Sequence, residues 1–468
     1  MTAPTHDHRD LDGRRAAAAA LAEGLCQQIA RTSRQVALPP AILQDLHRSL
    51  RQTPWLAPLA LVHLDRQPAP ADPWSRDLAL AEILLAAGQT DQAAPLAEAC
   101  HAADPGDLKA QDTVFRLEHT RRHGPPDPDR VGHELAGQYC PHPWSKMDFQ
   151  VDGAVTLCCS AWMPASVGDL FTDSVERLWN GPLAQDIRRT VADGSYRYCG
   201  KLACSFITGR KLKTPPPDGP PPPRRQSGPS IVNLSFDKTC NLACPSCRPH
   251  PIAAREDERT RYDQVVEEKI LPLLAEARRV EITGSGDPFA SKTFRRLLRR
   301  LDGPEHANLD IILMTNGVLA TEREWGRLGT VRQRIAEVNV SVDAARRETY
   351  DLLRRGGDFA ALGHNLRHMA GLRAAGELRH LRLCFVVQAA NFREMPDFVR
   401  WAEDLGVDAV HFQTLLDWGS MPPQAYRATA IHLPDHPEHA AFLEVLADPA
   451  LARPMARALA WEFAHLVP

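Results

Sequence analysis

Residues 234–250 read LSFDKTCNLACPSCRPH and place Cys240, Cys244 and Cys247 in one short loop directly after an apolar run. Three thiolates so close along the chain can converge, and such soft ligands select zinc or iron–sulfur clusters. A closed tetrahedral zinc site needs a fourth ligand, and only His250 is near in sequence. Three thiolates on a four-iron cluster instead leave one iron open to bind a cofactor or substrate. The loop therefore favours an iron–sulfur cluster, with structural zinc as the alternative.

Further apolar runs of strand length follow this loop, separated by helical patterns of about a dozen residues. With the run before the loop, they cover residues 231–236, 279–283, 309–314, 337–342, 381–387 and 409–412. Strands that alternate with helices are typical of a parallel sheet with right-handed crossovers. The pattern predicts an α/β fold, either a partial barrel or an open doubly wound sheet. Functional side chains should then lie at the carboxyl ends of the strands.

The pattern Cys240-x3-Cys244-x2-Cys247 after the first strand resembles the signature of the radical S-adenosylmethionine superfamily. The resemblance implies a partial (β/α)6 barrel and a 4Fe–4S cluster on the three cysteines. It also implies that S-adenosylmethionine chelates the open iron through its amino and carboxylate groups. One electron then cleaves the cofactor to a 5'-deoxyadenosyl radical, which abstracts a substrate hydrogen. Relatives often have an aromatic residue beside adenine where this chain has Ser246, so adenine must find another stacking surface.

The turn after the second strand, TGSGDP at residues 283–288, has glycines that let backbone groups approach a ligand closely. A plain turn is the alternative. At this place in the topology the turn resembles the superfamily's Gly-Gly-Glu-Pro motif, which binds the cofactor's ammonium group. The resemblance implies cofactor contacts by Gly284, Ser285, Gly286 and Asp287, with Asp287 in place of the usual glutamate.

Polar residues alternate with valines along the fourth strand, at Asn339, Ser341 and Asp343. One face of the strand is therefore polar, which suggests a ligand cavity inside a small barrel. Relatives resembling this chain use a serine and an arginine at this spacing for the cofactor's carboxylate, which implies Ser341 and Arg354. Arg355 is the fallback, and a solvated arginine is the alternative.

The fifth strand carries Cys384 and leads to Gln388 and Asn391 near its end. We expect Gln388 and Asn391 to contact the cofactor or the substrate. Cys384 could donate a hydrogen atom in an epimerase-like cycle, although a lone cysteine within a strand is more often an inert core residue. Cys384 and Asp343 are the candidates for a catalytic residue.

A second group of cysteines precedes the barrel. Cys140, twelve residues, Gly153, four residues and Cys158 resemble the opening of the SPASM domain, an auxiliary-cluster module of peptide-modifying radical enzymes. Cys199 and Cys204 supply a second pair. A full module has seven cysteines and two clusters, so four cysteines imply a reduced form with one auxiliary 4Fe–4S cluster. A four-cysteine zinc knuckle is the alternative.

The stretch between these pairs also resembles the module. Its Gly-Asn-Leu turn corresponds to Gly168-Asp169-Leu170, and its tryptophan helix to Trp179. Cys159 is spare in this assignment, or replaces Cys158. In most relatives the module follows the barrel, whereas here it precedes it.

The length of 468 residues allows roughly three domains. Residues 78–107 resemble one tetratricopeptide-type repeat, with an ordinary helical bundle as the alternative. The prolines at 214–229 exclude a helix or central strand and indicate a semi-rigid linker. The predicted parts are an all-α helical domain (1–130), a cysteine-rich α+β cluster domain (135–212), the Pro-rich linker (213–229), the barrel (230–430) and a C-terminal helical extension over the sheet (431–468).

Composition excludes several classes of function. A net charge of -3, with acids and bases interspersed, gives no electrostatic footprint for nucleic acid or anionic lipid. No apolar window reaches the ~18 residues of a membrane helix, and the N-terminus lacks the features of a signal peptide. We therefore expect a cytoplasmic protein. In that reducing compartment, the eleven cysteines are more suited to metal ligation than to disulfides. Cys26 and Cys100 lie on helical patterns and receive no ligand role.

The resemblance to the SPASM module implies an enzyme that modifies a peptide or protein by oxidation, cross-linking or epimerisation, with flavodoxin or ferredoxin as electron donor. The rival within the same chemistry is a small-molecule dehydrogenase acting on a sugar, an aminoglycoside or a related alcohol. A different class is a scaffold whose clusters sense redox state. Anaerobic turnover separates the scaffold from both enzymes.

Overall fold

The computed structural model describes residues 77–78, 81–82, 84–85, 90–123, 135–202, 204–416, 420–456 and 463. The chain divides into two compact units. Unit 1 comprises residues up to Cys140 together with 161–164 and 189–220, and unit 2 comprises 141–160, 165–188 and 221–468. No helix in these ranges is long and apolar enough to cross a membrane.

Unit 2 is built on one nine-stranded sheet in the order β3-β2-β1-β4-β5-β6-β7-β8-β9. The strands are β1 (Lys146–Phe149), β2 (Ala154–Thr156), β3 (Gly168–Asp169), β4 (Ile231–Leu234), β5 (Arg279–Ile282), β6 (Asp310–Thr315), β7 (Ile335–Ser341), β8 (His380–Val387) and β9 (Ala409–Thr414). Strands β4 to β9 are all parallel and coincide closely with the six apolar runs, so the prediction of a parallel α/β sheet is confirmed.

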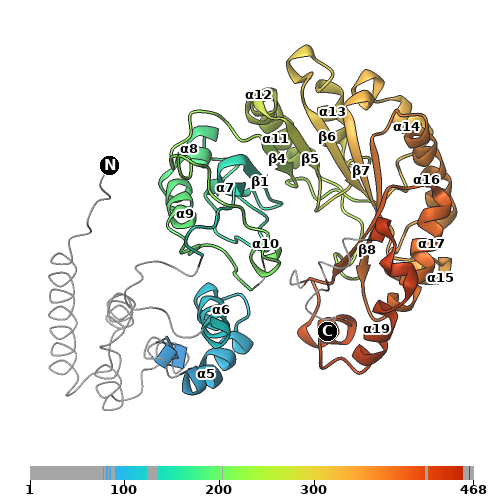
Figure 1. The fold of residues 1–468 in the computed structure, drawn as a ribbon. Coiled ribbons are helices and arrows are strands. Elements are labelled where there is room, and N and C mark those ends of the chain that lie inside the picture. Colours follow the sequence, from blue (N-terminus) through green and yellow to red (C-terminus); the bar gives the residue numbers. More distant parts are fainter. Residues whose placement is uncertain are drawn as a thin grey trace. The chain divides into compact units, whose positions relative to one another are not determined.

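The strands β4 to β9 are added in one direction without reversal. Right-handed crossovers then place every connecting helix on the same face, as in a barrel and unlike a doubly wound sheet. Figure 1 shows α13, α14, α16 and α17 along the outer side of these strands. Under the helices the strands are fully buried, for example at Val280, Leu313 and Val340.

The helices of unit 2 range from 4 residues in α7 to 16 in α16. They include α7 (His142–Ser145), α8 (Val175–Asn180), α11 (Glu256–Val265), α12 (Leu271–Glu276), α13 (Lys292–Arg300), α14 (Glu322–Gly326), α15 (Arg347–Leu353), α16 (Phe359–Ala374), α17 (Met395–Leu405), α18 (Pro423–Thr429) and α19 (His439–Leu446). Short π-helical and 3-10 segments are η2 (Val266–Ile270, a π-helix), η3 (Pro304–His306), η4 (Gly329–Arg334), η5 (Phe392–Glu394), η6 (Pro449–Ala452) and η7 (Pro454–Ala456).

The strands of the cysteine-rich region do not form a sheet of their own, which differs from the separate domain expected over 135–212. Strand β1 pairs in parallel with β4, from Lys146 opposite Ile231 to Phe149 opposite Leu234. The antiparallel strands β2 and β3 then extend the same sheet. This pairing satisfies the edge of β4, which would otherwise expose unpaired backbone groups.

The Pro-rich segment is also more than a spacer. Its backbone carbonyl groups accept hydrogen bonds from buried side chains of unit 2. A proline has no backbone N–H to donate, but its carbonyl oxygen can still accept a hydrogen bond. Trp144 Nε1 donates to Pro221 O at 2.9 Å, Arg188 Nη1 to Pro223 O at 2.7 Å, and Trp179 Nε1 to Ser227 O at 2.8 Å. These hydrogen bonds hold residues 221–227 against α7, α8 and the side chain of Arg188.

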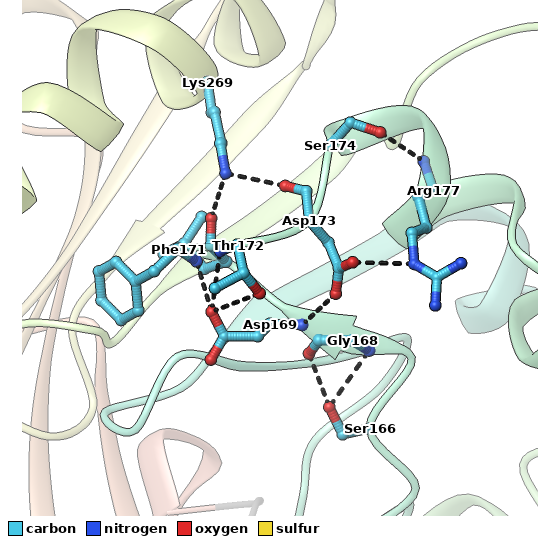
Figure 2. Close-up of polar contacts among 10 residues, drawn as sticks. Ser166, Gly168, Asp169, Phe171, Thr172, Asp173, Ser174, Arg177 and Lys269 are labelled. Carbon is cyan, nitrogen blue, oxygen red and sulfur yellow. Dashed lines mark hydrogen bonds and ion pairs between the residues drawn. The ribbon is translucent and has the colours of Figure 1, made fainter.

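Strand β3 and the turn after it, residues 168–173, connect the module strands to the barrel (Figure 2). Lys269, in the π-helical turn η2, donates from Nζ to Leu170 O at 2.6 Å and to Asp173 O at 2.8 Å. Gly168 has φ +153°, and an added Cβ would lie 2.5 Å from an Asp173 carboxylate oxygen, so only glycine fits. The ring of Phe171 completes the contact beneath the guanidinium of Arg261, 3.6 Å away.

Unit 1 contains the helical hairpin α5 (Thr90–Ala103) and α6 (Leu108–His123), together with α10 (Ser205–Thr208). Helix α9 (Pro182–Ala192) crosses the boundary between the units. The hairpin fits the second helix and the turn of the predicted repeat, but most of the helical domain expected over 1–130 lies outside the described residues. Lys201 forms a buried ion pair with Asp112 of α6, so the segment before Cys204 is anchored to this hairpin.

The predicted C-terminal helical extension is interrupted. Within the extension expected over 431–468, α19 ends at Leu446 and two 3-10 turns follow. Pro449 and Pro454 begin these turns, because proline has no amide to continue the α-helical hydrogen bonding. Turn η7 lies against β9, so this part of the extension does pack on the sheet.

Candidate functional site

The three-cysteine loop leaves the carboxyl end of β4. Cys240 exchanges two backbone hydrogen bonds with Ile252, at 2.8 and 3.0 Å, and Cys247 N donates to Cys244 O at 2.9 Å, which closes the loop into a turn. Burial raises the pKa of the Cys240 and Cys244 thiols, whereas Cys247 is exposed. The loop thus presents three thiols from a rigid backbone.

Within the described part of the chain, no three His, Cys, Asp or Glu side chains lie close enough to hold one metal ion. A four-iron cluster makes a different demand, because each thiolate binds a different iron and the sulfur atoms stay apart. Two buried polar atoms near the loop also lack hydrogen-bond partners, namely Arg354 Nε and the Tyr350 hydroxyl. The residues around the loop therefore fit a bound polar group.

The glycine turn after β5 packs directly on the cysteine loop. A Cβ on Gly286 would lie 2.5 Å from Asp237 O and 2.7 Å from Thr239 O, so glycine is required at this approach. Thr283 Oγ1 accepts from the amides of Ser285 and Gly286, at 3.0 and 3.1 Å. The turn expected to bind the cofactor therefore lies beside the expected cluster ligands.

Asp287, expected to contact the cofactor, has internal hydrogen-bond partners in this structure. Its side chain is fully buried and accepts four hydrogen bonds, from Thr315 Oγ1 at 2.7 Å and from the amides of Asn316, Phe289 and Ala290 at 2.8, 2.9 and 3.1 Å. Burial raises the pKa of this carboxyl group. With all its acceptor positions in use, Asp287 braces the glycine turn against the end of β6.

Asp343 and Arg354 form a buried ion pair at 2.7 Å. Asp343 has φ +63° just after β7, and its carboxylate also accepts from Val386 N at 2.8 Å. Burial raises the pKa of Asp343, and the adjacent guanidinium opposes that shift. Arg354 Nη1 lies 3.8 Å from Cys244 Sγ. The arginine expected to bind the cofactor's carboxylate is therefore next to the cysteine loop.

Ser341 and Cys384 are direct neighbours across β7 and β8, and His411 follows on β9. Ser341 is half-buried. Burial raises the pKa of Cys384 to about 12, so it remains a thiol at neutral pH. A thiol, unlike a thiolate, keeps a hydrogen atom that it could donate.

Asn391 and Gln388 are almost completely buried. Asn391 Nδ2 donates to Asp343 O and Val386 O, each at 2.9 Å, and its Oδ1 accepts from Gln388 N at 2.7 Å. All the hydrogen bonding of Asn391 except one lone pair is thus used to join the ends of β7 and β8. Asn391 thus braces the ends of β7 and β8, and the cofactor or substrate contact expected of it stays a prediction.

The auxiliary cysteines are divided between the units. Cys140, Cys199 and Cys204 belong to unit 1, where burial and then the charges of Cys204 and Cys140 raise the pKa of Cys199. Cys158 belongs to unit 2 and follows β2, with its Sγ 3.7 Å from His142 Nδ1.

Two residues of the site were not predicted. Asn316 follows β6, and its Nδ2 lies 3.8 Å from Cys240 Sγ and 2.9 Å from Asn241 Oδ1. Arg248 follows the third cysteine, and its Nε and Nη2 lie 3.3 and 3.2 Å from Cys247 Sγ. The place of Asn316 at the carboxyl end of a parallel strand was a usable signal, since such ends gather functional residues.

Comparison with known proteins supports the same assignment. Residues 140–205 match the SPASM family model, described as an iron–sulfur cluster-binding domain. The chain is 29% identical over 133 residues to GTP 3',8-cyclase of Pelotomaculum thermopropionicum, covering 28% of this chain and 39% of that protein. It is 27% identical over 180 residues to GTP 3',8-cyclase of Petrotoga mobilis, covering 37% and 52%. The chain therefore spans about half or less of the length of these relatives.

Two solved structures are similar to part of the chain at low identity. Streptococcus suis SuiB, bound to its precursor peptide SuiA, is 12% identical, with a TM-score of 0.31 and coverage of 41% of this chain and 40% of that one. The methyltransferase TsrM from Kitasatospora setae is 17% identical, with a TM-score of 0.31 and coverage of 46% and 49%.

The family match confirms the expected iron–sulfur domain. The match gives the chain an iron–sulfur cluster-binding domain, while S-adenosylmethionine and the cluster ligands stay predictions. Residues 140–205 are thus a SPASM iron–sulfur cluster-binding domain, and the chain is similar to GTP 3',8-cyclases over part of its length.

Proposed function

We propose that this enzyme cleaves S-adenosylmethionine reductively and removes a hydrogen atom from a peptide or protein substrate. The observation that carries the proposal is the meeting of three motifs at one end of the parallel sheet. The cysteine loop follows β4, the glycine turn packed on it through Gly286 follows β5, and Arg354, 3.8 Å from Cys244, lies at the end of α15.

The residues would divide the work of binding as follows. Cys240, Cys244 and Cys247 hold the cluster, and backbone carbonyls of the glycine turn accept from the cofactor's ammonium group. Ser341 and Arg354 face its carboxylate, which competes with Asp343 for the guanidinium. When bound, cluster and cofactor supply the 5'-deoxyadenosyl radical that takes the substrate hydrogen.

The face of the sheet away from the helices is suited to a polar substrate. Along β7 to β9 it carries Asn339, Arg382, His411 and Gln413, which alternate with fully buried apolar residues. Arg382 is paired with Glu337 at 3.0 Å. A peptide substrate is supported by the SPASM domain, which occurs in peptide-modifying radical enzymes, and by a helical hairpin suited to holding a partner.

A second candidate is a small-molecule enzyme, and the relatives named GTP 3',8-cyclase favour it because GTP is a small molecule. The cluster and cofactor sites would be the same in both cases. A redox-sensing scaffold is the third candidate, and it requires no cofactor cleavage.

The first experiment is anaerobic incubation of the reconstituted, reduced protein with S-adenosylmethionine, with 5'-deoxyadenosine measured by chromatography. We expect cleavage by the wild type and none by Cys240→Ala. Cys199→Ala should still bind the cofactor, because that cysteine lies in the other group. Cys100→Ala, in the buried face of α5, is the matched control and should behave as wild type. No cleavage by the wild type would contradict the enzyme proposal.

The substrate class needs a separate test. Peptides encoded beside this protein, deuterated at candidate positions, are compared with GTP and with deuterated sugar alcohols. Deuterium transfer into 5'-deoxyadenosine from a peptide supports the leading proposal. Transfer only from a small molecule would move the assignment to the second candidate.

A further inference from the structure

Each cysteine of the loop lies beside a nitrogen donor from a different side chain. Asn316 Nδ2 is 3.8 Å from Cys240 Sγ, and Arg354 Nη1 is 3.8 Å from Cys244 Sγ. Arg248 approaches Cys247 Sγ with both Nε and Nη2, at 3.3 and 3.2 Å. The three donors come from the loop itself, from the end of β6 and from the end of α15.

Arg248 is held firmly in this position. Its Nη1 donates to Lys238 O at 2.6 Å, and its Nη2 also donates to Ser285 O. One planar guanidinium thus joins the cysteine loop, the glycine turn and Cys247. A fixed fork of this kind loses little conformational entropy when it donates to a ligand sulfur.

The charge of Arg248 is also less compensated than that of the other arginine. Arg354 is paired with the buried carboxylate of Asp343 at 2.7 Å. The hydrogen bonds of Arg248 to oxygen go to backbone carbonyls, and no ion pair to it is found among the described residues. Its positive charge therefore acts mainly on the sulfur of Cys247.

We propose that Arg248, assisted by Asn316 and Arg354, raises the midpoint potential of the cluster on Cys240, Cys244 and Cys247. Reduction adds one negative charge to the cluster. Hydrogen bonds and positive charge at the ligand sulfurs stabilise that charge and make reduction easier. Arg248 is a positioning and tuning residue, and the inference rests on the proposed function because it requires a cluster on this loop.

The test is an anaerobic redox titration of the full-length protein, followed by electron paramagnetic resonance. Addition of S-adenosylmethionine identifies the relevant signal, because only the cluster with an open iron should respond to it. Arg248→Met removes both the charge and the donors, and its midpoint potential should become more negative than that of the wild type. Arg248→Lys keeps the positive charge but not the planar guanidinium, and its midpoint potential should lie between those of the wild type and Arg248→Met.

Arg255→Met is the matched control, since Arg255 is an exposed arginine of the same region that pairs with Asp257. Its potential should equal that of the wild type. Iron content is measured for every variant. Arg248→Met with full iron content and an unchanged potential would overturn the inference.

If Arg248→Met fails to assemble the cluster, Arg248→Lys and Asn316→Leu decide the question. Asn316→Leu removes a neutral donor and should lower the potential less than the loss of a charge would. Wild-type potentials in both would overturn the inference while leaving the proposed function intact. The absence of any cofactor-responsive signal in the wild type would overturn both together.

Discussion

Asp148 of β1 is a buried carboxyl group where the module strands join the barrel. It lies in register with Asn233 on β4 and, one strand further, with Glu281 on β5. The ammonium group of Lys146 is 3.4 Å from Asp148 and 3.7 Å from Glu281. Burial raises the pKa of Asp148 to about 6, and the nearby ammonium reverses only part of that shift.

This pKa predicts a pH dependence of stability. In the unfolded chain Asp148 ionises near its ordinary pKa of about 4, but in the folded chain it ionises near 6. Its contribution to the free energy of unfolding should therefore fall by up to about 3 kcal/mol as the pH rises from about 4 to about 6, and stay level above that. Urea unfolding of the wild type and Asp148→Asn measures this difference.

The exposed Asp152→Asn is the control and should give a curve parallel to that of the wild type. Parallel curves for Asp148→Asn as well would show that the Asp148 pKa is not raised. The comparison is made anaerobically, so that loss of the cluster does not add to the difference.

A polar residue at a strand end can either bind a ligand or form internal hydrogen bonds that hold the fold together. Its position in the sequence does not show which of the two roles it has. Asp287 and Asn391 stand where ligand-binding residues were expected, yet their side chains are consumed by internal hydrogen bonds. Their partners, Thr315 and Asp343, lie 28 and 48 residues away along the chain. Only the fold brings such donors and acceptors together, so bracing could not be distinguished from binding beforehand.

The π-helical turn η2 provides the next prediction, because Lys269 of this turn holds the module turn after β3 (Figure 2). In Lys269→Met the carbonyls of Leu170 and Asp173 lose a charged donor. Each hydrogen bond to a charged group contributes about 1.5–3 kcal/mol, so exchange of backbone amides over 168–174 should accelerate at least about tenfold. Hydrogen exchange measured by mass spectrometry reports this region directly.

Lys292→Met changes an exposed lysine of α13 and should leave these amides unaffected. Unchanged exchange in Lys269→Met would mean that the turn is held by the aromatic contact of Phe171 and by its own hydrogen bonds alone.

The division of the auxiliary cysteines between two compact units leads to a prediction for the whole chain. If Cys140, Cys158, Cys199 and Cys204 hold one 4Fe–4S cluster, the reconstituted wild type should contain about eight irons per chain. Cys158→Ala and Cys199→Ala should each reduce the count to about four, whereas Cys100→Ala should not change it. Iron, sulfide and zinc are measured on the same samples.

About four irons together with zinc in the wild type would contradict the auxiliary cluster and favour the zinc knuckle. A normal count in Cys158→Ala but a low count in Cys159→Ala would assign the ligand to the neighbouring cysteine.

Much of this protein could be inferred from local patterns. The six parallel strands are predicted by apolar runs between helical patterns. Cys240, Cys244 and Cys247 are recognisable because all three lie close together in one short loop. Such features depend on residues close together in sequence, where periodicity and spacing are directly visible.

Other features depend on contacts between distant segments. The pairing of β1 with β4 and the hydrogen bonds from Trp144 and Trp179 to the Pro-rich segment join residues about 50 to 85 positions apart. The same holds for the approach of Asn316 and Arg354 to the cysteine loop. The cysteine pattern predicts where a cluster would bind. The hydrogen-bond donors around the cysteine sulfurs depend on the packing of the complete sheet, because no local pattern encodes which segments will meet.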